Sequence, residues 1–74
     1  MSGAHPARDV VTVLRRLGYR LDRQTGSHAR FVKEGSAGVT VPIHSGDLAP
    51  TTFRSILRDM GVTHSTFEQL LRGE

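Results

Sequence analysis

In two stretches of the chain, apolar residues recur at the spacing of a helix. Between them lies a segment in which apolar and polar residues alternate, and this arrangement limits the folds open to the chain. The first stretch has apolar residues three and four positions apart: Val10, Val13, Leu14 and Leu17. The second repeats that spacing: Phe53, Ile56, Leu57 and Met60. Such stripes predict amphipathic helices, each with one buried face. Gly18 and Gly61 follow the stripes directly, as expected of left-handed residues that end helices.

The helix boundaries have their own signals. Pro6 suits the first helical position of the first helix, because that position needs no N–H group. A third, shorter helix is expected to start at Thr63, with Val62 and Phe67 spaced for a hydrophobic staple.

Between the helices, alternation predicts three short strands at residues 19–24, 28–33 and 39–41, separated by turns and ended by Pro42. The order αβββαα indicates an α+β fold, with a three-stranded antiparallel sheet covered by helices on one face. The covered face is expected to carry Leu21, Ala29, Phe31, Val39 and Val41. The open face then carries His28 and Arg30, with Arg20 as a candidate neighbour.

The length of 74 residues predicts one domain over residues 1–74, with residues 1–5 as a flexible tail in which His5 is solvated. The absence of cysteine excludes disulfides, thiolate zinc sites and a cysteine nucleophile. No segment resembles a signal peptide, and no apolar run approaches the roughly 20 residues that span a bilayer. We therefore expect a cytoplasmic protein without a membrane partner.

The charge of the chain favours a nucleic-acid partner. Ten Lys and Arg face seven Asp and Glu, for a net charge of +3, and nine of the ten cations are arginine. The planar guanidinium group binds phosphate and stacks on bases. A GC-rich genome would give the same arginine bias, so the charge alone does not decide the function.

Two of the four histidines are candidates for chemistry. His28 opens a strand after a glycine turn, and His44 follows the end of the third strand, whereas His64 is expected to be a surface helix residue. Histidine transfers protons near neutral pH, and RNA supplies its own nucleophile in the 2′-hydroxyl group. For His44 the sequence favours a loop histidine that fastens the exit of the third strand over a second proton carrier. The carboxylates are scattered and no metal-ligand motif is present, so we expect neither a metal nor a cofactor.

Four motifs follow one another along the chain: L-R-R-L-G-Y at residues 14–19, G-S-H-x-x-F at residues 26–31, V-P-x-H at residues 41–44 and R-S-I-L-R at residues 54–58. In this order and spacing they resemble the HicA family of toxins from type II toxin–antitoxin systems. The resemblance runs from about residue 10 to residue 71.

The resemblance implies a double-stranded-RNA-binding-like fold and metal-independent cleavage of single-stranded mRNA that blocks translation, with His28 as the catalytic residue. It also implies a HicB-type antitoxin as partner, with operator DNA bound only through that antitoxin. On this hypothesis Gly26, Ser27 and His44 support catalysis. The phosphates are bound by Arg20, Arg23, Arg30 and Lys33.

Two other interpretations stay open at this point. A non-catalytic RNA-binding module of the same fold would bind RNA without cutting it. A helix-turn-helix regulator would read duplex DNA with the last helix, through Gln69 and Arg72.

Overall fold

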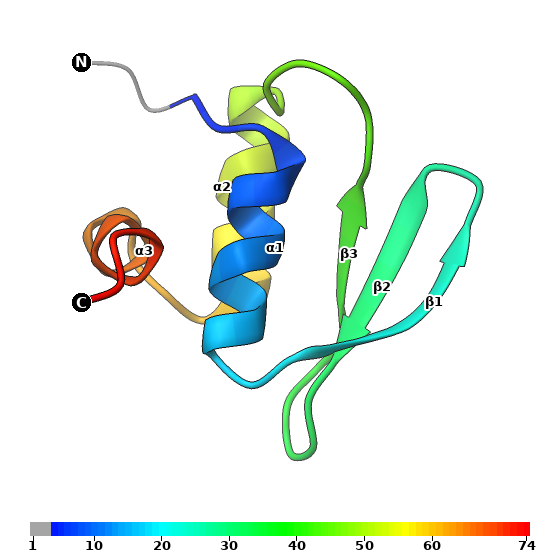
Figure 1. Ribbon diagram of the computed structural model, residues 1–74, viewed down its shortest axis with the longest axis horizontal. Helices are drawn as coiled ribbons and strands as arrows, with labels where there is room; N and C mark the ends of the chain where they lie inside the picture. Colours follow the sequence, from blue (N-terminus) through cyan, green and yellow to red (C-terminus); the bar gives the residue numbers. More distant parts are fainter. Residues whose placement is uncertain (1–3) are drawn as a thin grey trace.

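The computed structural model describes residues 4–74 and follows the predicted order of elements (Figure 1). The elements are α1 (Ala7–Arg16), β1 (Arg20–Thr25), β2 (His28–Val32), β3 (Val39–Pro42), α2 (Pro50–Met60) and α3 (His64–Leu71). The arrangement is an α+β fold of the double-stranded-RNA-binding-like class, as predicted.

The ends of α1 and α2 are set by proline and glycine. Pro50 occupies the start of α2, and Gly61 ends it in the left-handed region at φ 76°. Gly18 follows α1 with φ 97°. The prediction for Pro6 was wrong by one position: it is the extended residue before α1, not its first helical residue. Pro6 forms a β-bridge with Asp47, which holds it outside the helix.

Thr63, the expected start of the third helix, is the extended residue that caps α3, and the helix itself begins at His64. The Thr63 hydroxyl accepts a hydrogen bond from the Thr66 N–H at 3.1 Å, which satisfies a free donor of the first turn. Phe67 is fully buried, and the partly buried Val62 packs against the core.

The sheet is antiparallel with the order β1-β2-β3. Thr25 and His28 face each other across the first hairpin, so Gly26 and Ser27 form its two-residue turn. Gly26 has φ 59°, and no non-glycine residue among residues 4–74 has positive φ. A glycine at the first turn position only is typical of a type II′ turn, whose twist suits a hairpin.

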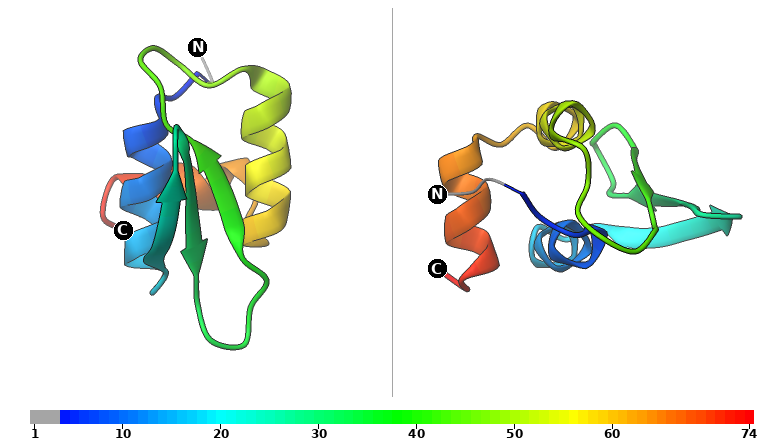
Figure 2. Two further views of the ribbon diagram at one scale, coloured as in Figure 1. Left: turned by 90° about the vertical axis from the view of Figure 1, so that its right-hand side faces the viewer. Right: turned by 90° about the horizontal axis from the view of Figure 1, so that it is seen from above.

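The helices form two layers on one face of the sheet. Viewed from above, α1 and α2 lie between the sheet and α3 (Figure 2, right). The buried apolar residues are Ala7, Val10, Val13, Leu14, Tyr19, Ala29, Phe31, Val39, Val41, Leu48, Phe53, Ile56, Leu57, Met60 and Phe67. No helix in the described part of the chain is long and apolar enough to cross a membrane.

The prediction that Leu21 belongs to the core was wrong. Leu21 pairs with the buried Phe31, yet its own side chain is 43% exposed. All residues of β1 are exposed, because α1 and α2 pack mainly on β3 and β1 projects beyond them (Figure 2, right). The outer edge of the sheet therefore has no helix to cover it.

Substitutions at the cross-strand pair Leu21 and Phe31 test the difference between the exposed edge of the sheet and its buried core. We expect Phe31→Ala to lower the free energy of unfolding by about 3–5 kcal/mol, because it opens a cavity in the core. Leu21→Ala should cost less than about 1 kcal/mol. Chemical denaturation measures both values, and a cost at Leu21 equal to that at Phe31 would place Leu21 in the core.

Candidate active site

The open face of the sheet brings three of the four predicted basic residues, the arginines, into one row. Residues opposite each other in an antiparallel pair share a face, and the register pairs Arg20 with Val32, Arg23 with Arg30, and Thr25 with His28. A β-bulge between Leu21 and Arg23 shifts the alternation of β1. The bulge moves Arg23 from the covered side to the side of Arg30 and His28.

His28 stands at one end of this row. It opens β2, lies between Thr25 of β1 and Pro42 of β3, and is exposed. Within residues 4–74 its imidazole ring makes no hydrogen bond or ion pair, so neither ring nitrogen is engaged by another described residue. Along β2, at about 3.3 Å per residue, Arg30 lies roughly 7 Å from His28 and Val32 roughly 13 Å from it. The row is long enough to follow an extended polynucleotide.

The chain brings His44 to the same end of the sheet. The Ile43 N–H donates to the Ser27 carbonyl, which continues the pairing of β2 and β3 beyond Pro42. The His44 Nδ1 lies 2.8 Å from the Ser45 carbonyl oxygen. Because a carbonyl only accepts, Nδ1 carries the proton, and in the neutral ring Nε2 is free to accept one. His44 is thus both fastened to its loop, as one interpretation expected, and equipped with a free nitrogen.

The turn before His28 leaves open space at Gly26. A Cβ atom at Gly26 would meet no atom within 4 Å, so the residue is needed for its left-handed backbone and not for lack of room. The Gly26 carbonyl accepts a hydrogen bond from Gln24 Nε2 at 3.1 Å, which steadies the turn. Both residues of the turn, Gly26 and Ser27, are exposed.

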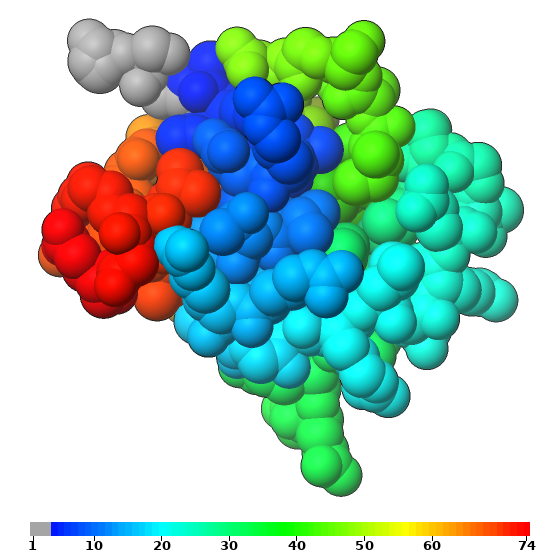
Figure 3. Space-filling model, in the orientation of Figure 1, coloured from blue at the N-terminus to red at the C-terminus, as the bar shows by residue number. Residues whose placement is uncertain are grey.

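The three arginines of the open face have no carboxylate within ion-pair distance among residues 4–74. The Arg30 guanidinium lies against Gly38, where a Cβ atom would come within 2.6 Å of its Cζ atom. Gly38 ends the loop between β2 and β3, which projects from the body of the molecule (Figure 3). A hollow of about 350 Å³ beside Arg20 is lined also by Val32, Lys33 and Glu34.

Lys33 differs from the arginines, because its charge is already engaged. Its Nζ donates to the Leu17 carbonyl at 3.1 Å and lies 5.0 Å from the centre of the Tyr19 ring. These contacts tie the end of β2 to the segment between α1 and β1. The geometry gives Lys33 a structural contact, and its predicted role in phosphate binding remains a prediction.

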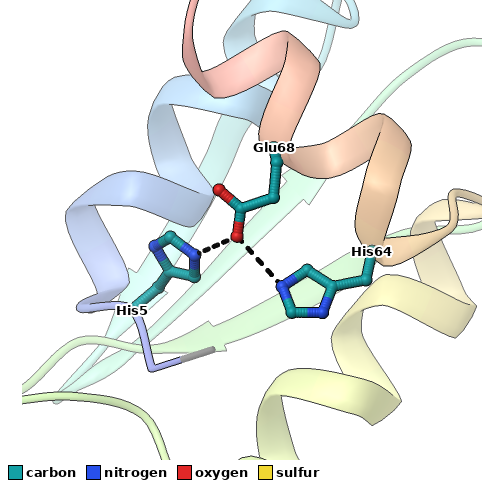
Figure 4. A group of neighbouring side chains, drawn as sticks. All are labelled: His5, His64 and Glu68. Atoms are coloured by element: carbon teal, nitrogen blue, oxygen red, sulfur yellow. Dashed lines mark hydrogen bonds and ion pairs between the residues drawn. The ribbon is translucent and has the colours of Figure 1, made fainter. Parts of the chain in front are cut away.

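A second cluster of ionisable residues lies on the far side of the helices (Figure 4). His5 donates from Nδ1 to Asp9 at 2.8 Å and from Nε2 to Glu68 at 2.7 Å, and His64 Nε2 donates to the same Glu68 oxygen at 3.0 Å. The prediction that His5 is solvated was wrong, since its side chain is only 12% exposed. Residues 1–3 of the predicted tail lie outside the described residues.

The protonation of this cluster follows from its contacts. Burial lowers the pKa of His5, but the hydrogen bonds to Asp9 and Glu68 outweigh burial and leave that pKa raised. The hydrogen bond from His5 lowers the pKa of Glu68, with a smaller contribution from His64. The spacing of four residues within each pair, His5–Asp9 and His64–Glu68, is visible in the sequence. The contact between the two pairs, 63 residues apart at His5 and Glu68, has no sequence signal.

The different environments of Lys33 and Arg20 can be tested by comparing how substitutions at each residue change the free energy of unfolding. We expect Lys33→Met to lower the free energy of unfolding by about 0.5–1.5 kcal/mol, because the Leu17 carbonyl loses its partner. Arg20→Met, on the same hollow, should change it by less than about 0.5 kcal/mol. Urea denaturation measures both, and equal effects would contradict the structural contact of Lys33.

Comparison with known proteins gives one family. The family described as "HicA toxin of bacterial toxin-antitoxin" matches residues 7–62 of the chain, which include all three strands and α2. No individual curated protein matches the chain significantly.

Proposed function

The chain belongs to the HicA toxin family and is thus a toxin of a toxin–antitoxin system, and on this premise we propose that it is an mRNA interferase. It cleaves single-stranded mRNA without a metal and thereby blocks translation, with His28 as its catalytic residue. The observation that carries the proposal is the exposed His28 at the end of a row of unpaired arginines on the open sheet face.

The proposed reaction is an attack within the RNA. His28 accepts the proton of the 2′-hydroxyl, the 2′-oxygen forms a bond to phosphorus, and the P–O5′ bond breaks. The products are a 2′,3′-cyclic phosphate and a 5′-hydroxyl, whose oxygen takes a proton from a second group. His44 is the candidate for that group, because it lies at the same end of the sheet and its ring can carry a proton on Nε2.

The remaining residues of the open face bind and stabilise phosphate. Arg23 and Arg30 face each other beside His28, where they would offset the charge of the pentacoordinate phosphorus. The Gly26–Ser27 backbone allows close approach of the scissile phosphate. Arg20, at the other end of the row, binds a phosphate farther along the strand. Lys33 adds positive charge there.

We further propose the partner and the place of action that this function requires. A HicB-type antitoxin neutralises the toxin by covering the open sheet face and His28, and operator DNA is bound only through that antitoxin. The protein acts in the cytoplasm, where its mRNA substrate is found.

The helix-turn-helix alternative receives little support from the geometry of α3. Its central residue Phe67 is fully buried, and the Arg72 guanidinium pairs with Glu74 at 3.1 Å. The remaining competitor is a non-catalytic RNA-binding module, which the next experiment separates from an enzyme.

We expect His28→Gln to lower the rate of RNA cleavage by about 100- to 10,000-fold, because a positioned proton acceptor contributes that much. Purified protein is incubated with a single-stranded RNA in EDTA, well below its unfolding temperature, and the cut ends are mapped. Gln69→Ala, an exposed change on α3, is the control and should cleave normally. RNA bound but left uncut by the wild type would favour the binding module, and normal cleavage by His28→Gln would exclude His28 as the catalyst.

The phosphate contacts should appear in the salt dependence of RNA binding. In the His28→Gln background, Arg23→Gln and Arg30→Gln should each reduce the slope of log K against log salt by roughly 0.7, the value for one phosphate contact on a single strand. Arg72→Gln removes the same charge from the far side of the molecule and should leave the slope unchanged. Fluorescence anisotropy measures the slopes; an equal loss for all three variants would mean that only net charge matters.

A further inference from the structure

Three ligand atoms converge where the segment before α1 meets α3, on the side of the helices away from the sheet. They belong to His5, His64 and Glu68, and all lie within 4.8 Å of one another (Figure 4). We propose that these residues form a binding site for a divalent transition-metal ion of the Zn²⁺ type. The site is separate from His28 and does not depend on the proposed cleavage.

The ligand set and its spacing fit such an ion. Two imidazole nitrogens and one carboxylate oxygen are a known zinc combination that leaves a fourth position for water. Zinc bonds of about 2.1 Å place tetrahedral ligands roughly 3.4 Å apart. Glu68 Oε2 now lies 2.7 Å from His5 Nε2 and 3.0 Å from His64 Nε2, so small side-chain movements admit the ion. The two Nε2 protons that now point at Glu68 would leave as the metal binds.

The ligands are held in place before any ion binds. The His5 ring packs against both Phe53 and Phe67, with centroid distances of 5.3 and 5.0 Å, and the His64 ring lies 5.5 Å from Phe53. The His5 carbonyl accepts a hydrogen bond from Leu48 N–H at 2.8 Å, which fixes its backbone. These contacts fix the His5 ring and restrict that of His64, so little ordering remains for metal binding to impose.

Asp9 supplies a further feature of metal sites. It accepts a hydrogen bond from His5 Nδ1 at 2.8 Å, which leaves Nε2 as the nitrogen directed at the ligand position. Metal-bound histidines commonly donate their other N–H to a carboxylate in this way, which orients the ring and raises its basicity.

A bound ion would connect residue 5 to α3 and so fasten the two ends of the fold. His64 and Glu68 lie four residues apart on one face of α3, and His5 precedes α1. An ion that binds the folded chain but not the unfolded chain stabilises the folded state by mass action. The His64 side chain is 51% exposed, so an ion can reach the site from solvent.

Zinc chloride titrated into chelator-treated full-length protein tests the site. Isothermal calorimetry should show one zinc ion per chain, and saturating zinc should raise the unfolding temperature by about 4 °C or more. His64→Gln should weaken binding by at least about 100-fold and abolish the rise in temperature. Asp9→Asn, which changes only the partner of His5, should weaken binding by about 10- to 100-fold.

His44→Gln is the matched control, because His44 is an exposed histidine outside the cluster. It should bind zinc as tightly as the wild type. His64 is exposed enough for His64→Gln to fold, which circular dichroism verifies. The proposal is overturned if the wild type binds no zinc, which would leave the cluster as an ion-pair contact only. It is also overturned if His64→Gln and His44→Gln weaken binding equally, since zinc would then bind surface histidines at random.

Discussion

The burial of the inner faces of β2 and β3 beneath α1 and α2 is the interaction on which this structure depends. Phe31, Val39 and Val41 project from the sheet into a core that the helices close. A chain of this length without disulfides has no other source of comparable stability. Since one face of the sheet is committed to this core, all polar chemistry on the sheet must lie on its opposite face.

The sequence predicted this division well where its signals are local. The apolar stripes at Val10 and Phe53, the glycines that end the helices and the alternation of β2 all depend on neighbours within a few residues, and the structure matches them. The expectation of an outward-facing His28 rested on the same alternation. The family resemblance added the roles of the residues, which alternation alone cannot supply.

The differences arise where long-range geometry overrides a local pattern. Leu21 follows the alternation of a covered strand, yet α1 and α2 pack mainly on β3 and leave β1 exposed. The bulge that turns Arg23 toward Arg30 is set by pairing with β2, and nothing in the sequence of β1 marks it. His5 looked like part of a tail because its partners Glu68 and Phe67 lie more than sixty residues away. Each error concerns which distant element lies beside a residue.

The exposed position of β1 has a consequence for association between copies of the chain. An edge strand offers a row of free N–H and C=O groups on which another strand can pair. Here Arg20, Asp22 and Arg23 occupy that edge, and the bulge interrupts its regular spacing. Charges and bulges are the features that natural sheets use against strand addition. The arginines proposed to attract RNA therefore also repel other copies of the sheet, so binding and resistance to aggregation depend on the same side chains.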